Sequence, residues 1–125
     1  MKHAEIIRAY AALGRLGKTE IPLETSYRLF KIRKMLRPQW DFQCERMDAI
    51  LQKYEPRFQM DGSYKFKSQR EAEKCVEEMN KAMEEINQMD IDLADIKRPA
   101  VKLDTDIRLS MDDIEALADF VDFTE

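Results

Sequence analysis

Few side chains in this 125-residue sequence are of the types that carry catalytic chemistry. His3 is the only histidine, and Cys44 and Cys75 are the only cysteines. A Ser-His-Asp triad or a His/Cys zinc site needs a placed imidazole or several of these ligands together. The glycines at 14, 17 and 62 form no phosphate-binding loop. We therefore predict a protein that is not an enzyme and that needs no metal or other cofactor.

Acidic pairs are the remaining candidates for ligand chemistry. They are Asp90/Asp92, Asp104/Asp106 and Asp112/Asp113. An Asp-x-Asp pair on a strand places both carboxylates on one face, where they can bind a divalent cation. The spacing lacks the glycine and the final glutamate of an EF-hand loop. We interpret the pairs as solvent-facing alternation, and cation binding stays open.

A basic stretch at residues 28–37 is the most informative charged segment. It contains no acid and five positive charges: Arg28, Lys31, Arg33, Lys34 and Arg37. Helical spacing places Lys31 and Lys34 opposite the apolar stripe that includes Leu29, which makes a basic amphipathic helix. Such a face suits phosphates, an acidic partner or the protein's own acidic helix. Aromatic residues at core-like positions argue against nucleic acid.

The C-terminal segment supplies a second set of candidate partner contacts. Ser110 is a suitable N-cap, and the following acids lie where the helix dipole favours anions. Phe120 and Phe123 lie off the apolar stripe, so they either widen the buried face or meet a partner helix or groove. The candidate residues here are Asp112, Asp113, Asp119, Phe120 and Phe123.

Charge is divided unevenly along the chain. Residues 1–67 hold 14 Lys and Arg against 8 Asp and Glu, whereas residues 68–125 hold 7 against 17. The halves either complement each other or leave one face for a charged partner. No stretch approaches the ~18 apolar residues of a membrane span, and the first residues lack a secretory pattern. We expect a cytoplasmic protein with two reduced thiols.

Periodicity predicts the elements that position these residues. We expect a single domain over residues 1–125, with helices at 1–17, 25–54, 68–89 and 110–122. Eight apolar residues step by three or four along the second helix: Leu29, Ile32, Leu36, Trp40, Cys44, Met47, Leu51 and Tyr54. Pro38 should kink this helix without ending it. A β-hairpin at 57–67 turns through a three-residue loop with Gly62 at positive φ, and strands fill 90–109.

The predicted fold class is mainly α, of the α+β type. The two long helices form an antiparallel hairpin with the β-hairpin at its tip, followed by short strands and a C-terminal helix. Ser68 should cap the third helix. The tight connection predicts a register with Tyr54 opposite Gln69, and we expect both cysteines to be small core residues.

The order of these elements resembles a family of small proteins from tailed phages and prophages of Gram-positive bacteria. The segments that carry the resemblance are IPLETSYRLFKIRKML, DGSYKF, EAEKCVEEMNKAMEEINQM and LSMDDIEALADFV. The family's function is unknown, so no residue role carries over. The resemblance implies a virus-encoded cytosolic protein that binds rather than catalyses.

Three functional hypotheses follow. The first is a non-enzymatic protein-binding factor, either an inhibitor of a host defence protein or a virion accessory or assembly protein. The second is a nucleic-acid-associated regulator that uses residues 28–37. The third is a self-associating structural protein with an adaptable methionine interface on the third helix.

Overall fold

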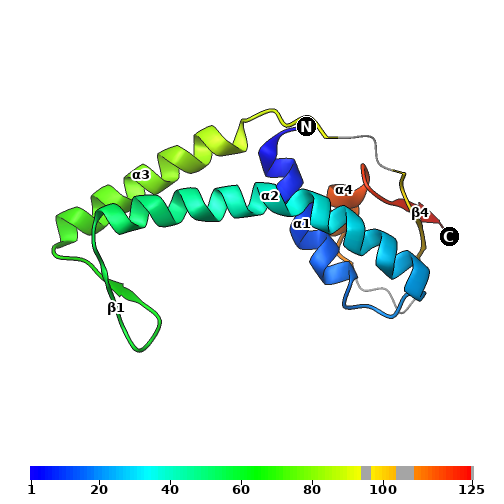
Figure 1. Cartoon of the computed structure of the whole chain (residues 1–125), viewed down its shortest axis with the longest axis horizontal. Coiled ribbons are helices and arrows are strands. Elements are labelled where there is room, and N and C mark those ends of the chain that lie inside the picture. The colour runs from blue at the N-terminus through cyan, green and yellow to red at the C-terminus, as the bar shows by residue number, and fades with distance from the viewer. Residues whose placement is uncertain (94–96, 104–108, 125) are drawn as a thin grey trace. The chain divides into compact units, whose positions relative to one another are not determined.

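The computed structural model describes residues 1–93, 97–103 and 109–124 (Figure 1). Its helices there are α1 (His3–Leu16), α2 (Leu23–Lys53), α3 (Gln69–Asn87) and α4 (Met111–Leu117). β1 (Arg57–Phe58) pairs antiparallel with β2 (Tyr64–Lys65), and β3 (Ala100–Lys102) pairs parallel with β4 (Asp122–Thr124). The predicted class, mainly helical α+β with a long-helix hairpin, is confirmed.

The chain forms two compact units. Unit 1 contains residues 1–40 and 90–125, and unit 2 contains residues 41–89. Unit 2 is therefore an insertion within the chain of unit 1. Helix α2 begins in unit 1, continues through Pro38 as one helix, and ends in unit 2. The prediction that Pro38 does not end this helix is confirmed.

The core of unit 1 forms where α1, the first half of α2 and the C-terminal segment meet. Each element contributes apolar residues at three- or four-residue steps, which places them on one face. Helices α1 and α4 lie side by side. The buried residues include Ile6, Leu13, Leu16, Leu29, Ile32, Leu36, Val101, Leu117, Phe120 and Val121.

The strands of unit 1 differ from those predicted. Of the described residues in 90–109, only Ala100–Lys102 is a strand, although Asp90 also bridges Lys2. Helix α4 ends at Leu117, not at 122, and the chain continues as β4. Pairing between β3 and β4 brings together residues about twenty positions apart. Such long-range pairing overrides the local helical pattern on which the prediction depended.

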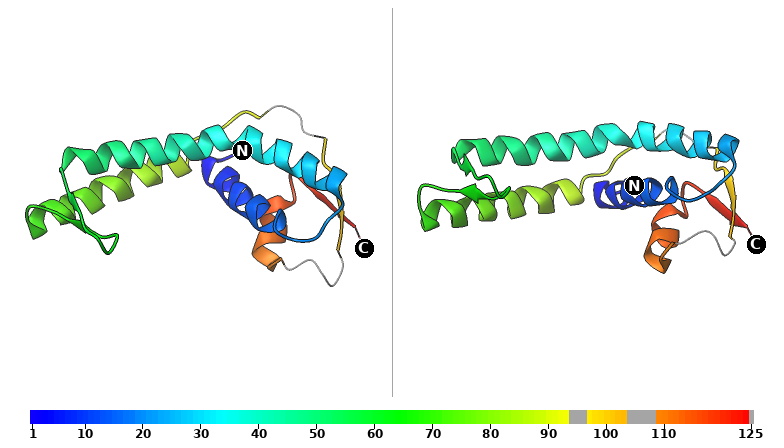
Figure 2. Two further views of the ribbon diagram at one scale, coloured as in Figure 1. Left: turned by 60° about the horizontal axis from the view of Figure 1, so that its bottom comes forward. Right: turned by 90° about the horizontal axis from the view of Figure 1, so that it is seen from below.

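Unit 2 is a helical hairpin in which α3 runs antiparallel to the second half of α2 (Figure 2). Ser68 caps α3 as predicted, since its hydroxyl accepts a hydrogen bond from the Glu71 N–H at 3.2 Å. The turn between β1 and β2 is a three-residue loop, Met60 to Gly62, closed by Gln59 N–H to Ser63 O at 2.8 Å. Gly62 has φ +88°, as predicted.

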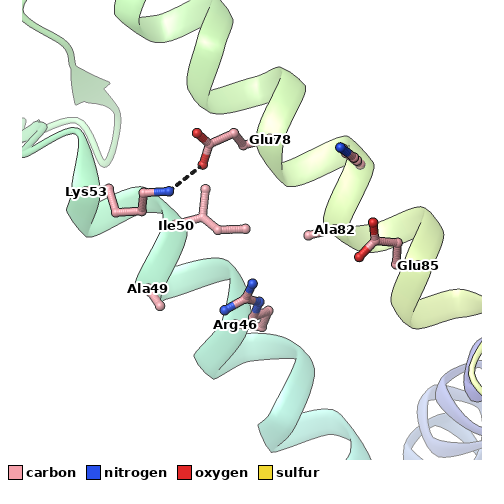
Figure 3. A pocket seen from close by; sticks show the side chains of 8 residues that line it. Arg46, Ala49, Ile50, Lys53, Glu78, Ala82 and Glu85 are labelled. Carbon is pink, nitrogen blue, oxygen red and sulfur yellow. Dashed lines mark hydrogen bonds and ion pairs between the residues drawn. The ribbon is translucent and has the colours of Figure 1, made fainter.

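The register of the two long helices differs from the predicted one. The Tyr54 hydroxyl donates to Glu78 at 2.7 Å. Lys53 Nζ lies 3.0 Å from the same carboxylate, as Figure 3 shows. Tyr54 was predicted to face Gln69, so α3 is displaced by about two and a half turns. The prediction was wrong because it assumed a connection that reverses the chain directly. The first turns of α3 instead extend past the end of α2.

The two cysteines lie in different surroundings. Cys75 is buried, as predicted, but Cys44 is exposed. The expectation that Cys44 is a core residue was wrong because Leu36, Trp40 and Cys44 are joined by four-residue steps. Each such step advances the position by about 40° beyond a full turn, so the stripe drifts around the helix.

The thiol of Cys44 is expected to react with a water-soluble maleimide much faster than the thiol of Cys75. Only Cys44 is accessible, and burial raises the pKa of Cys75, with the nearby Glu78 charge adding to the shift. Mass spectrometry of peptides from briefly labelled native protein measures both rates. In denaturant the two rates should converge. Equal rates in the native protein would contradict the assigned burial.

Candidate partner-binding surface

The first half of α2 displays large apolar side chains on its solvent side. Leu23 is 86% exposed, Tyr27 59% and Phe30 58%. Their spacing of four and then three residues places them on one face, and Lys34 follows four residues later. We call Leu23, Tyr27, Phe30 and Lys34 the outer stripe. The buried Leu29, Ile32 and Leu36 lie on the opposite side of the same helix.

The aromatic side chains of the outer stripe are held by contacts within α2. The Tyr27 and Phe30 rings stack with centroids 6.3 Å apart and an interplanar angle of 25°. Lys31 Nζ lies 5.4 Å from the centroid of the Tyr27 ring. A cation–π contact at an exposed site contributes roughly 0.5–1 kcal/mol. The exposed rings are thus partly ordered before any partner is bound.

Most of the predicted basic residues surround this stripe. Lys31, Lys34 and Arg37 are exposed. Arg28 is also exposed and lies 2.8 Å from Glu24, one turn away. Exposed pairs at this spacing contribute only about 0.3–0.5 kcal/mol, so Arg28 can exchange its partner at little cost.

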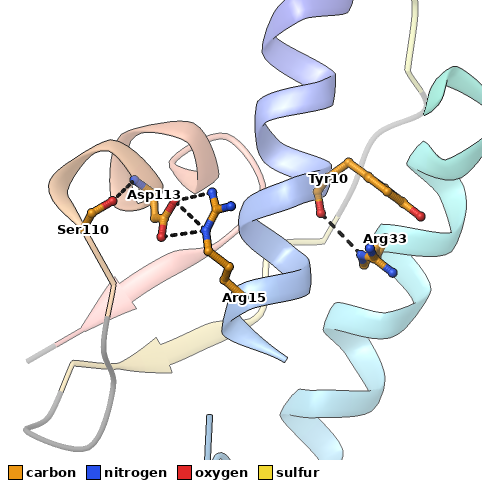
Figure 4. A network of polar contacts seen from close by, with 5 residues as sticks. All are labelled: Tyr10, Arg15, Arg33, Ser110 and Asp113. Atoms are coloured by element: carbon orange, nitrogen blue, oxygen red, sulfur yellow. Dashed lines mark hydrogen bonds and ion pairs between the residues drawn. The ribbon is translucent and has the colours of Figure 1, made fainter. Parts of the chain in front are cut away.

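Arg33 is the exception, because it is used inside unit 1. Its guanidinium carbon lies 4.0 Å from the centroid of the Tyr10 ring, and Nε donates to the Tyr10 carbonyl at 3.3 Å (Figure 4). It also lies close to Gly14, where an added Cβ would come within 3.2 Å of the guanidinium. Arg33 therefore joins α2 to α1 and does not belong to the outer surface.

The C-terminal candidates divide in the same way. Asp113 is buried and accepts hydrogen bonds from Arg15 Nε at 3.1 and 3.0 Å (Figure 4). Phe120 is buried in the core of unit 1, so both residues have roles within the fold. Phe123 is half-buried, whereas Asp112 and Asp119 are exposed.

Asp112 and Asp119 line an acidic hollow in unit 1 with a volume of about 550 Å³. Glu5 and Glu115 add two further carboxylates, and Arg8 is the one basic side chain in its lining. Among the described residues, no cluster of His, Cys, Asp and Glu side chains has the geometry to hold a metal ion. The excess of carboxylates in its lining is therefore the one property that distinguishes this hollow from the surrounding surface.

The Asp-x-Asp pairs are only partly described. Asp90 forms an ion pair with Lys2 at 3.0 Å, and Asp92 is exposed. One carboxylate of this pair is thus already neutralised by a cation of the protein. Asp104 and Asp106 lie outside the described residues, and so do residues 94–96 of the predicted strand.

A second hollow, of about 260 Å³, lies between α2 and α3 (Figure 3). Its apolar floor is made by Ile50 and Ala82. The hydrogen bond to Glu78 raises the pKa of Tyr54 to about 12, and the same bond, with Lys53, lowers the pKa of Glu78. Both shifts move the pKa values further from pH 7, whereas general acid–base catalysis requires pKa values close to the working pH.

Sequence reasoning missed Tyr27 and Phe30, which it assigned to core-like positions. The available signal was the spacing of Leu23, Tyr27 and Phe30, which forms a second helical stripe beside the one that defines the core. Only one of two stripes on a single helix can face the unit 1 core, and the sequence does not indicate which one faces a partner.

Comparison with known proteins gives no match to a family model, to a curated protein or to a solved structure. Within the described part of the chain, no helix is both long enough and apolar enough to cross a membrane.

Proposed function

We propose that this chain is a non-enzymatic protein-binding factor and that the outer stripe is its binding face. The observation that supports the proposal is the exposure of Leu23, Tyr27 and Phe30 on one face of α2. Contiguous exposed apolar surface is uncommon on monomeric proteins and marks interaction sites. Aromatic and arginine side chains, both present here, are the residue types that dominate binding energy at interfaces.

The phage resemblance suggests where such a partner would be found. A factor of this kind would bind a host protein, as an inhibitor of a defence protein does, or a virion protein during assembly. The absence of a prepared acid, base or nucleophile from the surfaces described above is in keeping with a role in binding.

Capture from extracts of Gram-positive bacteria, before and after phage infection, tests the proposal. The double variant Tyr27→Ser/Phe30→Ser should lose a partner that the unaltered chain captures, by about tenfold or more. Met60→Ser/Met111→Ser is the matched control, because both methionines are highly exposed but lie away from the stripe. Equal capture by the stripe variant, or no specific capture by the unaltered chain, would refute the proposal.

A nucleic-acid-associated regulator is the second candidate, and one observation favours it. Tyr27 and Phe30 alternate with Arg28, Lys31 and Lys34 on an exposed face, and single-stranded nucleic acid is bound by aromatic and basic residues together. A gel shift that weakens steeply with salt, and that Lys31→Glu/Lys34→Glu abolishes, would support this function. No shift at low salt would exclude it.

A further inference from the structure

We infer that the outer stripe binds an acidic amphipathic helix of a separate protein. This inference rests on the proposed function and specifies the element that the partner presents. It draws on three properties of the stripe, namely its shape, its charge and the order of its residues along α2.

The shape of the stripe favours a helix as the bound element. Leu23, Tyr27 and Phe30 form a ridge along a regular helix, and ridges with three- and four-residue spacing pack into the grooves of another helix. The backbone N–H and C=O groups inside α2 are used for its own hydrogen bonds, so the stripe offers no edge to which an extended peptide could add as a strand.

The charge around the stripe favours an acidic partner. Between Leu23 and Arg37 the only acid is Glu24, which Arg28 already neutralises. Helical spacing places Lys31 beside the stripe, and Lys34 lies within it. In helix pairs, opposite charges beside the apolar contact select the partner and its orientation.

The order of residues gives the partner helix a direction. The apolar part of the stripe lies toward the start of α2, and Lys34 follows it. A helix that packs antiparallel would bring its own first turn to Lys34. Acidic residues in a first turn are also favoured by the helix dipole. The expected partner therefore has acids in its first turn and apolar residues at three- and four-residue steps after it.

Two observations disfavour nucleic acid as the occupant. The Tyr27 ring already contacts Phe30 and Lys31 within α2, so a base stacked on this ring would have to compete with those contacts. Leu23 is the most exposed apolar residue of the stripe and offers a base no stacking surface.

The test uses the full chain and two labelled synthetic peptides, each about 20 residues long so that a helix can form. One has leucines at heptad positions with glutamates in the first turn and on the flanks. The other is identical except that lysine replaces glutamate. Fluorescence anisotropy should show the glutamate peptide binding at least about tenfold more tightly than the lysine peptide, an advantage that decreases with added salt.

Charge exchange makes the test specific. Lys31→Glu/Lys34→Glu should reverse the preference so that the lysine peptide binds more tightly, and Tyr27→Ser/Phe30→Ser should weaken both. Lys18→Glu/Lys65→Glu, an equal charge change at exposed lysines elsewhere, should leave the preference unchanged.

Four results would overturn the inference. The first would be that neither peptide binds although capture from extracts still depends on Tyr27 and Phe30; the proposed function would then stand with a different partner element. The second would be equal binding of both peptides to the Lys31→Glu/Lys34→Glu variant. The third would be stripe-dependent binding of an oligo(dT) strand without binding of the glutamate peptide. The fourth would be self-association in sedimentation that Tyr27→Ser/Phe30→Ser removes, which would make a second copy the occupant.

Discussion

Replacing Phe120 with alanine is expected to destabilise unit 1 by about 3–5 kcal/mol, the cost of removing a buried aromatic ring and leaving a cavity. Phe120 is 2% exposed and lies in a core with Leu117, Val121 and Leu16. The loss is a large fraction of the ~5–15 kcal/mol that stabilises a typical domain. Urea unfolding followed by tryptophan fluorescence measures it. Trp40, the only tryptophan, stacks on Tyr10 in unit 1 and therefore reports on that unit.

Phe30→Ala is the control for this substitution. Phe30 lies in the part of α2 that belongs to unit 1 and is 58% exposed, so its loss should change the stability of unit 1 by no more than about 0.5 kcal/mol. A Phe120→Ala variant that unfolds within about 1 kcal/mol of the unaltered chain would contradict the packing of the C-terminal segment against α1. Phe120 would then again be a candidate for contact with a partner.

Removing the carboxylate of Asp113 is expected to cost about 2 kcal/mol at neutral pH, the range for hydrogen bonds to charged groups. The Asp113 side chain is 10% exposed, whereas that of Arg15 is 54% exposed. The guanidinium is therefore rehydrated in Asp113→Ala, which keeps the cost below that of breaking a fully buried pair. Unfolding of unit 1, followed through Trp40, is again the measurement.

The effect of Asp113→Ala should depend on pH in a definite direction. Arg15 holds the pKa of Asp113 below its usual range, so the folded state binds this proton less tightly than the unfolded state. The stabilisation is fully present above the unfolded pKa of about 4 and is lost as the pH falls through the lower folded value. The difference between the unaltered chain and Asp113→Ala should accordingly shrink in acid.

Asp112→Ala is the matched control for the charge at the start of α4. Asp112 and Asp113 both lie in the first turn, so both removals weaken the favourable dipole interaction, but Asp112 is exposed. Its removal should cost less than about 1 kcal/mol. Equal losses from the two variants would mean that the ion pair with Arg15 does not contribute.

Local sequence signals predicted the elements with local causes. Ser68 and Ser110 begin helices because their hydroxyls accept hydrogen bonds from N–H groups three residues later. Gly62 makes its turn because glycine adopts positive φ without strain. The fold class followed from the 3.6-residue apolar period over long segments. Each of these features depends on residues within one or two helical turns of one another.

The predictions that failed involve residues distant in the chain. Strand β4 exists through its pairing with β3, and no residue near 122–124 signals that pairing. The helix register depends on how far the segment between Tyr54 and Ser68 carries the chain, which residue types do not specify. The exposure of Tyr27 and Phe30 depends on which side of α2 meets α1. The basic part of the candidate surface was predictable, and its aromatic part was not.

The insertion of unit 2 within unit 1 has a consequence for biosynthesis. A ribosome releases α1 and the first half of α2 long before β3, α4 and β4, and Arg15 is synthesised 98 residues ahead of Asp113. Unit 2 is one continuous segment, residues 41–89, so all of it is synthesised before β3, α4 and β4 and it can fold first. The part of the α1 apolar face that packs against the C-terminal segment stays uncovered during this interval and is exposed to chaperones and to aggregation. The nascent chain is thus most vulnerable while its inserted hairpin is already complete.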